Sequence, residues 1–79
     1  MNKIGKKDVL EYFLIKKEGT IRDVAEYLIG KYKINGNINY KKFYQNILYY
    51  VRVLEEEGSI KRKKWLGAWV FEFQNRAFI

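Results

Sequence analysis

Four consecutive basic residues, Lys61 to Lys64, lead directly into two tryptophans and an apolar run in the stretch GSIKRKKWLGAWVFEF (58–73). Ammonium and guanidinium groups at this density can bind anions, above all phosphate and carboxylate. A buried core excludes such charges, and a disordered basic tail has no use for the aromatic rings. The pattern therefore indicates a folded, exposed basic element.

The positive charge of the chain is concentrated in one segment. The net charge is +7, from 16 Lys and Arg against nine Asp and Glu. Residues 1–30 carry +1, residues 31–64 carry +6 and residues 65–79 carry zero. This segregation predicts a polyanionic partner, with a merely solvated basic surface as the alternative.

Composition excludes several classes of function. The 79 residues predict one domain, with a core at about 6–73 and a short tail at 74–79. Cys and His are absent, which excludes disulfides, the usual zinc sites and catalysis by either residue. There is also no paired carboxylate, no nucleophile with a base and no glycine-rich phosphate loop. We therefore expect that the protein is not an enzyme and that it binds no metal, cofactor or small-molecule ligand.

Membrane association is not expected either. No apolar run approaches the ~20 residues that cross a bilayer, and Met1 is not followed by a signal-peptide pattern. The absence of Cys fits an intracellular location, so we expect a cytoplasmic protein.

Hydrophobic periodicity predicts three helices, at about residues 6–17, from 21 to either 30 or 32, and at 40–57. Gly19 is expected to end the first helix. Thr20 and Asp23 have the spacing of a capping box at the start of the second. Asn39 is a favourable N-cap for the third.

The third helix has two distinct faces. With Ile47 at the centre of the buried face, a step of ~100° per residue groups Tyr40, Phe43, Tyr44, Tyr50, Val51 and Leu54 around it. The opposite stripe contains no acidic residue and consists of Lys41, Lys42, Gln45, Tyr49 and Arg52. The acidic run Glu55 to Glu57 follows, where it would keep the helix end away from an anionic ligand.

Residues 59–73 predict a β-hairpin. The favoured register places Ile60 opposite Phe73, Arg62 opposite Phe71 and Lys61 opposite Glu72. Leu-Gly is a poor sequence for a two-residue type I′ turn, so a four-residue loop over 65–68 is expected. Ile60, Phe71 and Phe73 would anchor the hairpin, while the basic run and both tryptophans would project outward.

The order of these elements resembles the winged helix-turn-helix family. The fragments that carry the resemblance are TIRDVAEYL (20–28), LEEEGSI (54–60) and FEF (71–73), in a region of about Val9 to Phe73. The linker before the third helix is longer than is typical of the family, and the tip of the hairpin is apolar. The resemblance implies an α+β fold of three helices followed by a two-stranded β-hairpin wing.

The same resemblance implies sequence-specific binding of double-stranded DNA, typical of small transcription regulators of archaea, bacteria and their viruses. The helix at 40–57 would lie in the major groove, where Gln45 could read adenine and Arg52 or Lys41 guanine. The wing residues Lys61, Arg62, Lys63 and Lys64 would contact phosphates or the minor groove. Thr20 and Arg22, at the start of the second helix, would contact a phosphate. The location would be nucleoid-associated, in the host cytoplasm for a virus-encoded protein.

Other roles remain open for single residues. Thr20 is first of all an N-cap, Lys42 and the run 61–64 could be solvated, and Tyr49 could be a plain surface residue or a dimer contact. Trp69 could cap the core and stack on Arg62 or Lys64. Trp65 could be a dimer contact or a wedge against DNA.

A homodimer is expected because one small module reads few base pairs. Exposed apolar groups would form the contact, and the candidates are Tyr12, Trp65, Trp69 and Phe78. A tail tucked over the core would be the other explanation for Phe78. The alternative function is a protein–protein interaction module in a larger nucleoprotein or transcription assembly. RNA is disfavoured because a helix does not enter the narrow A-form major groove easily.

Overall fold

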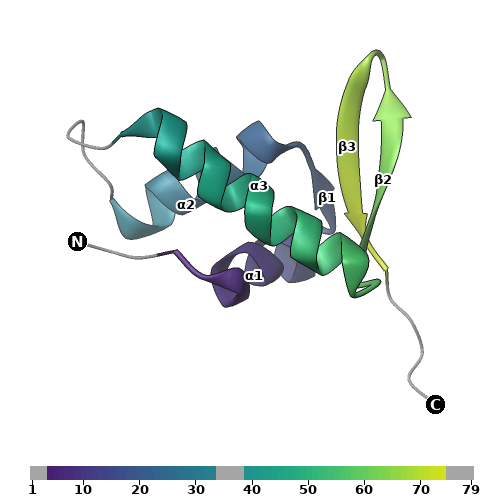
Figure 1. Ribbon diagram of the computed structural model, residues 1–79, viewed down its shortest axis with the longest axis horizontal. Helices are drawn as coiled ribbons and strands as arrows, with labels where there is room; N and C mark the ends of the chain where they lie inside the picture. The colour runs from purple at the N-terminus through teal and green to yellow at the C-terminus, as the bar shows by residue number, and fades with distance from the viewer. Residues whose placement is uncertain (1–3, 34–38, 75–79) are drawn as a thin grey trace.

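The computed structural model describes residues 4–33 and 39–74. Over these residues the chain is an α+β protein of three helices and one three-stranded antiparallel sheet. The elements follow the order α1 (Lys6–Lys16), β1 (Glu18–Gly19), α2 (Ile21–Tyr32), α3 (Tyr40–Glu56), β2 (Ile60–Trp65) and β3 (Ala68–Phe73). The strand order is β1-β3-β2: β1 pairs with β3, so the sheet has a third strand in addition to the predicted two-stranded hairpin. Figure 1 shows the three helices gathered into one body, from which the hairpin projects at one end.

All three helices and the base of the hairpin contribute to one hydrophobic core. Each element supplies side chains with little or no solvent exposure, among them Val9, Phe13, Val24, Leu28, Ile47, Val51, Leu54, Ile60 and Phe71. On α3, Ile47, Val51 and Leu54 are buried as predicted. The other members of the predicted face are partly buried against the core, namely Phe43, Tyr44 and Tyr50, except for Tyr40, which lies in the first turn and is half exposed. Burial of these side chains is the main source of stability.

The predicted helix starts are confirmed. The Thr20 hydroxyl accepts a hydrogen bond from the Asp23 amide at 3.1 Å, and the Asp23 carboxylate accepts one from the Thr20 amide at 2.9 Å. The Asn39 side chain accepts from the Lys42 amide at 3.2 Å. These bonds satisfy amides that the first turn of a helix leaves without partners.

Gly19 has a different role from the predicted helix stop. Lys17, with a φ of 74°, ends α1. Gly19 lies in β1 opposite Phe71, and a Cβ at this position would be 2.0 Å from the Tyr12 hydroxyl oxygen. That hydroxyl donates a hydrogen bond to the Glu18 carbonyl at 2.9 Å. Gly19 is therefore required by the close approach of a tyrosine.

This packing also corrects the prediction for Tyr12. The sequence placed it among the exposed aromatic residues, whereas its ring is buried, with 5% of its surface exposed. Burial, together with the charges of Asp23 and Glu18, raises the pKa of the phenol to about 12. Tyr12 joins α1 to the sheet and does not form part of a surface.

The register of the hairpin is as predicted, and its turn is not. Ile60 pairs with Phe73, Lys61 with Glu72, and the ladder continues to Trp65 and Ala68. The connection is therefore a two-residue loop, and not the predicted four-residue one. Both loop residues, Leu66 and Gly67, have positive φ values of 50° and 83°, as a type I′ turn requires. For Leu66 this conformation costs about 1–2 kcal/mol, which is why the sequence favoured the longer loop.

Candidate nucleic-acid interface

The outward stripe of α3 is fully on the surface. Its members Lys41, Lys42, Gln45, Tyr49 and Arg52 are all exposed. They lie opposite the buried residues Ile47, Val51 and Leu54, because residues three and four apart share one side of a helix. The Tyr49 ring packs edge-on against Tyr50 at 5.2 Å between centroids, which restricts its orientation. The stripe thus presents three cations, an amide and a phenol with no carboxylate among them.

Leu48 belongs beside this stripe, and the sequence analysis did not include it. The side chain is 41% exposed and lies one turn before Arg52. Its direction is about 100° from Ile47, at the boundary between the two faces. The signal that could have found it is a leucine outside the apolar arc of an otherwise regular amphipathic helix.

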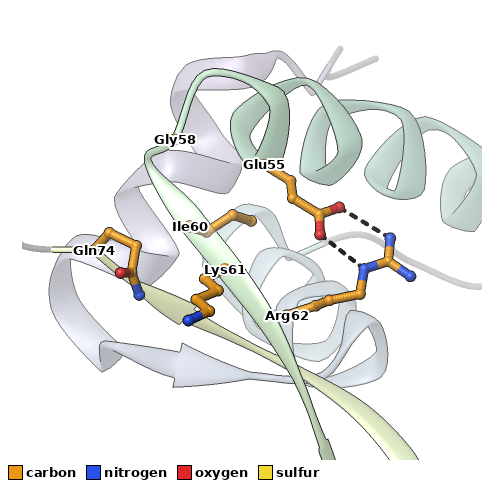
Figure 2. A pocket seen from close by; sticks show the side chains of 6 residues that line it. All are labelled: Glu55, Gly58, Ile60, Lys61, Arg62 and Gln74. Atoms are coloured by element: carbon orange, nitrogen blue, oxygen red, sulfur yellow. Dashed lines mark hydrogen bonds and ion pairs between the residues drawn. The ribbon is translucent and has the colours of Figure 1, made fainter.

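Glu55 connects α3 to the hairpin. Its carboxylate accepts two hydrogen bonds from the Arg62 guanidinium, from Nε at 2.8 Å and from Nη2 at 2.9 Å (Figure 2). These bonds hold the pKa of the Glu55 carboxyl below its usual value, against the opposing effect of burial. The bidentate geometry fixes the angle at which the hairpin leaves α3.

The acidic run is paired with cations of the chain itself. Glu55 binds Arg62, and the Glu57 carboxylate lies 2.6 Å from the Lys6 ammonium on α1. Two of its three carboxylates are thus held by cations of the same chain. They stabilise the junction of α1, α3 and the hairpin, and a role in excluding anions is not needed to explain them.

The four consecutive basic residues divide between the two faces of the hairpin, because successive side chains of a strand point to opposite sides. Arg62 and Lys64 lie on the face toward α3, and both approach the Trp69 ring, at 5.1 and 4.8 Å from its centroid. The stacking proposed for Trp69 is confirmed in this respect. Arg62 also lies 5.3 Å from the Phe71 ring, so its guanidinium is held by contacts on several sides.

Lys61 and Lys63 occupy the other face of the hairpin. The Lys63 ammonium lies between two carboxylates, 3.1 Å from Glu18 on β1 and 3.2 Å from Glu72 on β3. Glu72 thus pairs diagonally with Lys63, although Lys61 is directly opposite it. Within residues 4–33 and 39–74, Lys61 and Lys64 form no ion pair with a carboxylate. They are the two hairpin cations whose charge remains available for an external anion.

The start of α2 is occupied by its own capping box. Thr20 and Asp23 use each other's amides, and the Asp23 carboxylate already provides negative charge at the positive end of the helix. Arg22 is exposed and lies 3.1 Å from Glu26, one turn later. The Thr20 side chain serves as the N-cap.

The remaining aromatic candidates differ in exposure. Trp65 is 63% exposed and Trp69 47%, so both offer apolar surface on the distal part of the hairpin. Phe78 lies outside the described residues.

An open hollow lies where α3 meets the base of the hairpin. The hollow drawn in Figure 2 is open and is lined by Glu55, Gly58, Ile60, Lys61, Arg62 and Gln74. Among residues 4–33 and 39–74, no three acidic side chains lie close enough together to hold a metal ion. No helix in the same ranges has the length and apolar character needed to cross a membrane.

No family model, curated protein or solved structure matches the chain significantly.

Proposed function

We propose that the protein binds double-stranded DNA sequence-specifically as a winged helix-turn-helix transcription regulator, with α3 in the major groove and the hairpin as the wing. The observation that carries the proposal is the combination of an acid-free exposed stripe on α3 with a basic hairpin fixed to the same helix by Glu55 and Arg62. A three-stranded sheet is compatible with such a fold. The major groove, about 12 Å wide, admits an α-helix.

The stripe on α3 has the chemistry for reading base edges. Gln45 can form two hydrogen bonds with adenine, and Arg52 or Lys41 can bind guanine through O6 and N7. Lys42 and Tyr49 flank them and suit phosphate oxygens. Leu48, exposed beside Arg52, adds an apolar contact of the kind that thymine methyl groups accept.

The hairpin supplies contacts that do not depend on base sequence. Lys61 and Lys64 are the primary phosphate ligands in this proposal, because Arg62 and Lys63 already bind carboxylates of the protein. Thr20 and Arg22 are secondary in this proposal, because the Thr20 hydroxyl serves the capping box and Arg22 pairs with Glu26.

A homodimer is part of the proposal, since two modules across a two-fold axis recognise a longer site than one. Outside the hairpin, exposed apolar side chains suited to such a contact are Leu14 and Ile15 on α1. Light scattering measures the mass of the protein in solution and so distinguishes a dimer from a monomer.

Charge reversal at the stripe tests DNA binding. Lys41→Glu combined with Lys42→Glu should abolish measurable binding to a random duplex in fluorescence anisotropy. The folded state should tolerate the change, since both residues are exposed and acidic groups favour the first turn of a helix. The control, Lys7→Glu with Lys16→Glu on α1, changes the net charge equally at exposed positions. Equal losses of affinity in both variants would show that binding depends only on net charge and would contradict the assigned site.

Specificity has its own test. Gln45→Ala should cost about 1–3 kcal/mol of binding free energy on the site selected from a random duplex pool, and little on random DNA. An equal loss on both would assign Gln45 to the DNA backbone.

A further inference from the structure

The tip of the hairpin departs from ordinary surface structure in two ways. Leu66 is 90% exposed, which makes it the most exposed large apolar side chain among the described residues. It also has a φ of 50°, in the left-handed region that Asn and Gly adopt far more readily. A residue that is unfavourable both for the turn and for the solvent points to a function at that position.

The surroundings of Leu66 are apolar at the end of the hairpin and cationic just below it. Trp65 precedes it in the chain, and Trp69 lies one ladder step further down on β3. Lys64 lies next to the tip on one face of the hairpin; on the other face Lys63 is paired with Glu18 and Glu72, so Lys61, further from the tip, provides the unpaired cation there. An apolar tip with cations on both faces matches a groove that has phosphates along both walls. A flat anionic surface would contact the cations of only one face of the hairpin.

The hairpin is also narrow and firmly held. Its two strands lie about 4.8 Å apart, and a two-residue loop is the tightest end such a ribbon can have. Gly67 adds no side chain to the tip. Arg62 is fixed to Glu55 on α3, and Leu66 stands four residues, or about 13 Å, beyond it. With α3 in the major groove, this reach approaches the half turn of about 17 Å that separates neighbouring grooves.

We propose that Leu66 is an apolar wedge that enters the DNA minor groove and partly unstacks one base step, while Lys61 and Lys64 bind the phosphates on the two sides of the groove. The proposal rests on the DNA binding proposed above and specifies the mode of contact of the hairpin. Side chains such as leucine open base steps in this way and bend the duplex toward the major groove. Pyrimidine–purine steps unstack most easily, so the preferred site should contain one beneath the tip.

Leu66→Asn removes the apolar side chain at the tip without destabilising the folded protein. Asparagine adopts the left-handed conformation more readily than leucine, so the variant should have a higher thermal midpoint than the parent. The matched control is Leu66→Met, which keeps an apolar side chain of similar volume at the tip. Both variants keep every basic residue.

The probe is a duplex with 2-aminopurine at a thymine–purine step, labelled at both ends for energy transfer. We expect the wild-type protein and Leu66→Met to increase the 2-aminopurine fluorescence and to shorten the end-to-end distance. Leu66→Asn should lose both signals and bind about tenfold more weakly, as expected for one leucine no longer buried.

Each other outcome has a defined meaning. If the wild type binds the duplex but Leu66→Asn matches it in affinity, fluorescence and bending, the wedge is wrong and DNA binding stands. If the wild type binds no duplex at low salt, the proposed function fails and the wedge with it. A loss of mass in light scattering or of binding to anionic vesicles in Leu66→Asn, without any change in 2-aminopurine fluorescence, would assign the tip to a second copy of the chain or to lipid and overturn the proposal.

Discussion

The base and the tip of the hairpin belong to the same two strands but differ in solvent exposure. At the base, Ile60 and Phe71 are each 2% exposed, and Arg62 is paired with Glu55. At the tip, Trp65 is 63% exposed and Leu66 90%. A continuous ladder connects the two regions, so the packed base can hold an exposed tip in a fixed position. The hairpin is thus packed into the core at one end and presents exposed apolar side chains at the other.

Truncation of an aromatic ring at each end should give the largest contrast in stability. Phe71→Ala should cost about 3–5 kcal/mol of unfolding free energy, since it empties a buried site. Trp65→Ala should change it by about 0.5 kcal/mol or less, as at other exposed positions. Urea denaturation at neutral pH measures both. Similar losses for the two variants would show that the tip also carries the fold.

Gly19, which pairs with Phe71 at the base of the hairpin, provides a second test of the packing there. Gly19→Ala should cost about 1–3 kcal/mol of unfolding free energy because the new methyl group meets the Tyr12 hydroxyl. Gly30→Ala is the control: Gly30 is exposed on α2 with nothing within 4 Å of a Cβ, and the substitution should stabilise the helix by about 0.5–1 kcal/mol. Tyr12→Phe should reduce the Gly19→Ala penalty in the double variant. A neutral Gly19→Ala would contradict the close approach of Tyr12.

The ion pair that fixes the base should give a smaller, pH-dependent effect. Glu55→Gln should cost about 1 kcal/mol of unfolding free energy at pH 7, a modest value because both side chains are partly exposed to solvent. Arg62 lowers the folded-state pKa of Glu55, so the folded protein binds fewer protons there than the unfolded chain. The stabilisation is present above the unfolded pKa and is lost as the pH falls through the folded one.

The difference between the parent and Glu55→Gln should therefore shrink in acid. Glu26→Gln, which breaks an exposed pair with Arg22, should have little effect at any pH. A Glu55→Gln difference that stays constant from pH 7 to acid would contradict the assigned pair.

The sequence predicted those features of the fold that depend on local patterns. Ile60 has to face the core together with Phe71, and that requirement was sufficient to give the register. Thr20 and Asn39 were identified as caps because a capping side chain acts within three residues of its position.

The features that were missed depend on contacts between distant segments. Strand β1 has two residues, too few to show an alternating pattern. Gly19 looked like a helix end because nothing in the local sequence indicates that Tyr12 packs against it. The Glu55–Arg62 pair depends on the angle at which β2 leaves α3 after Gly58, which the helical pattern does not specify. The conformation of Leu66 is imposed by the ladder on a residue that does not favour it. The assignment of the stripe on α3 to DNA remains a prediction.

The salt dependence of affinity tests the central proposal most directly. The dissociation constant for a random duplex would be measured by anisotropy from low to moderate salt. If about six to eight phosphates are neutralised per protomer, the logarithm of the association constant should fall against the logarithm of salt concentration with a slope of roughly −5 to −7. A slope near zero, or no binding at the lowest salt concentration, would contradict the account.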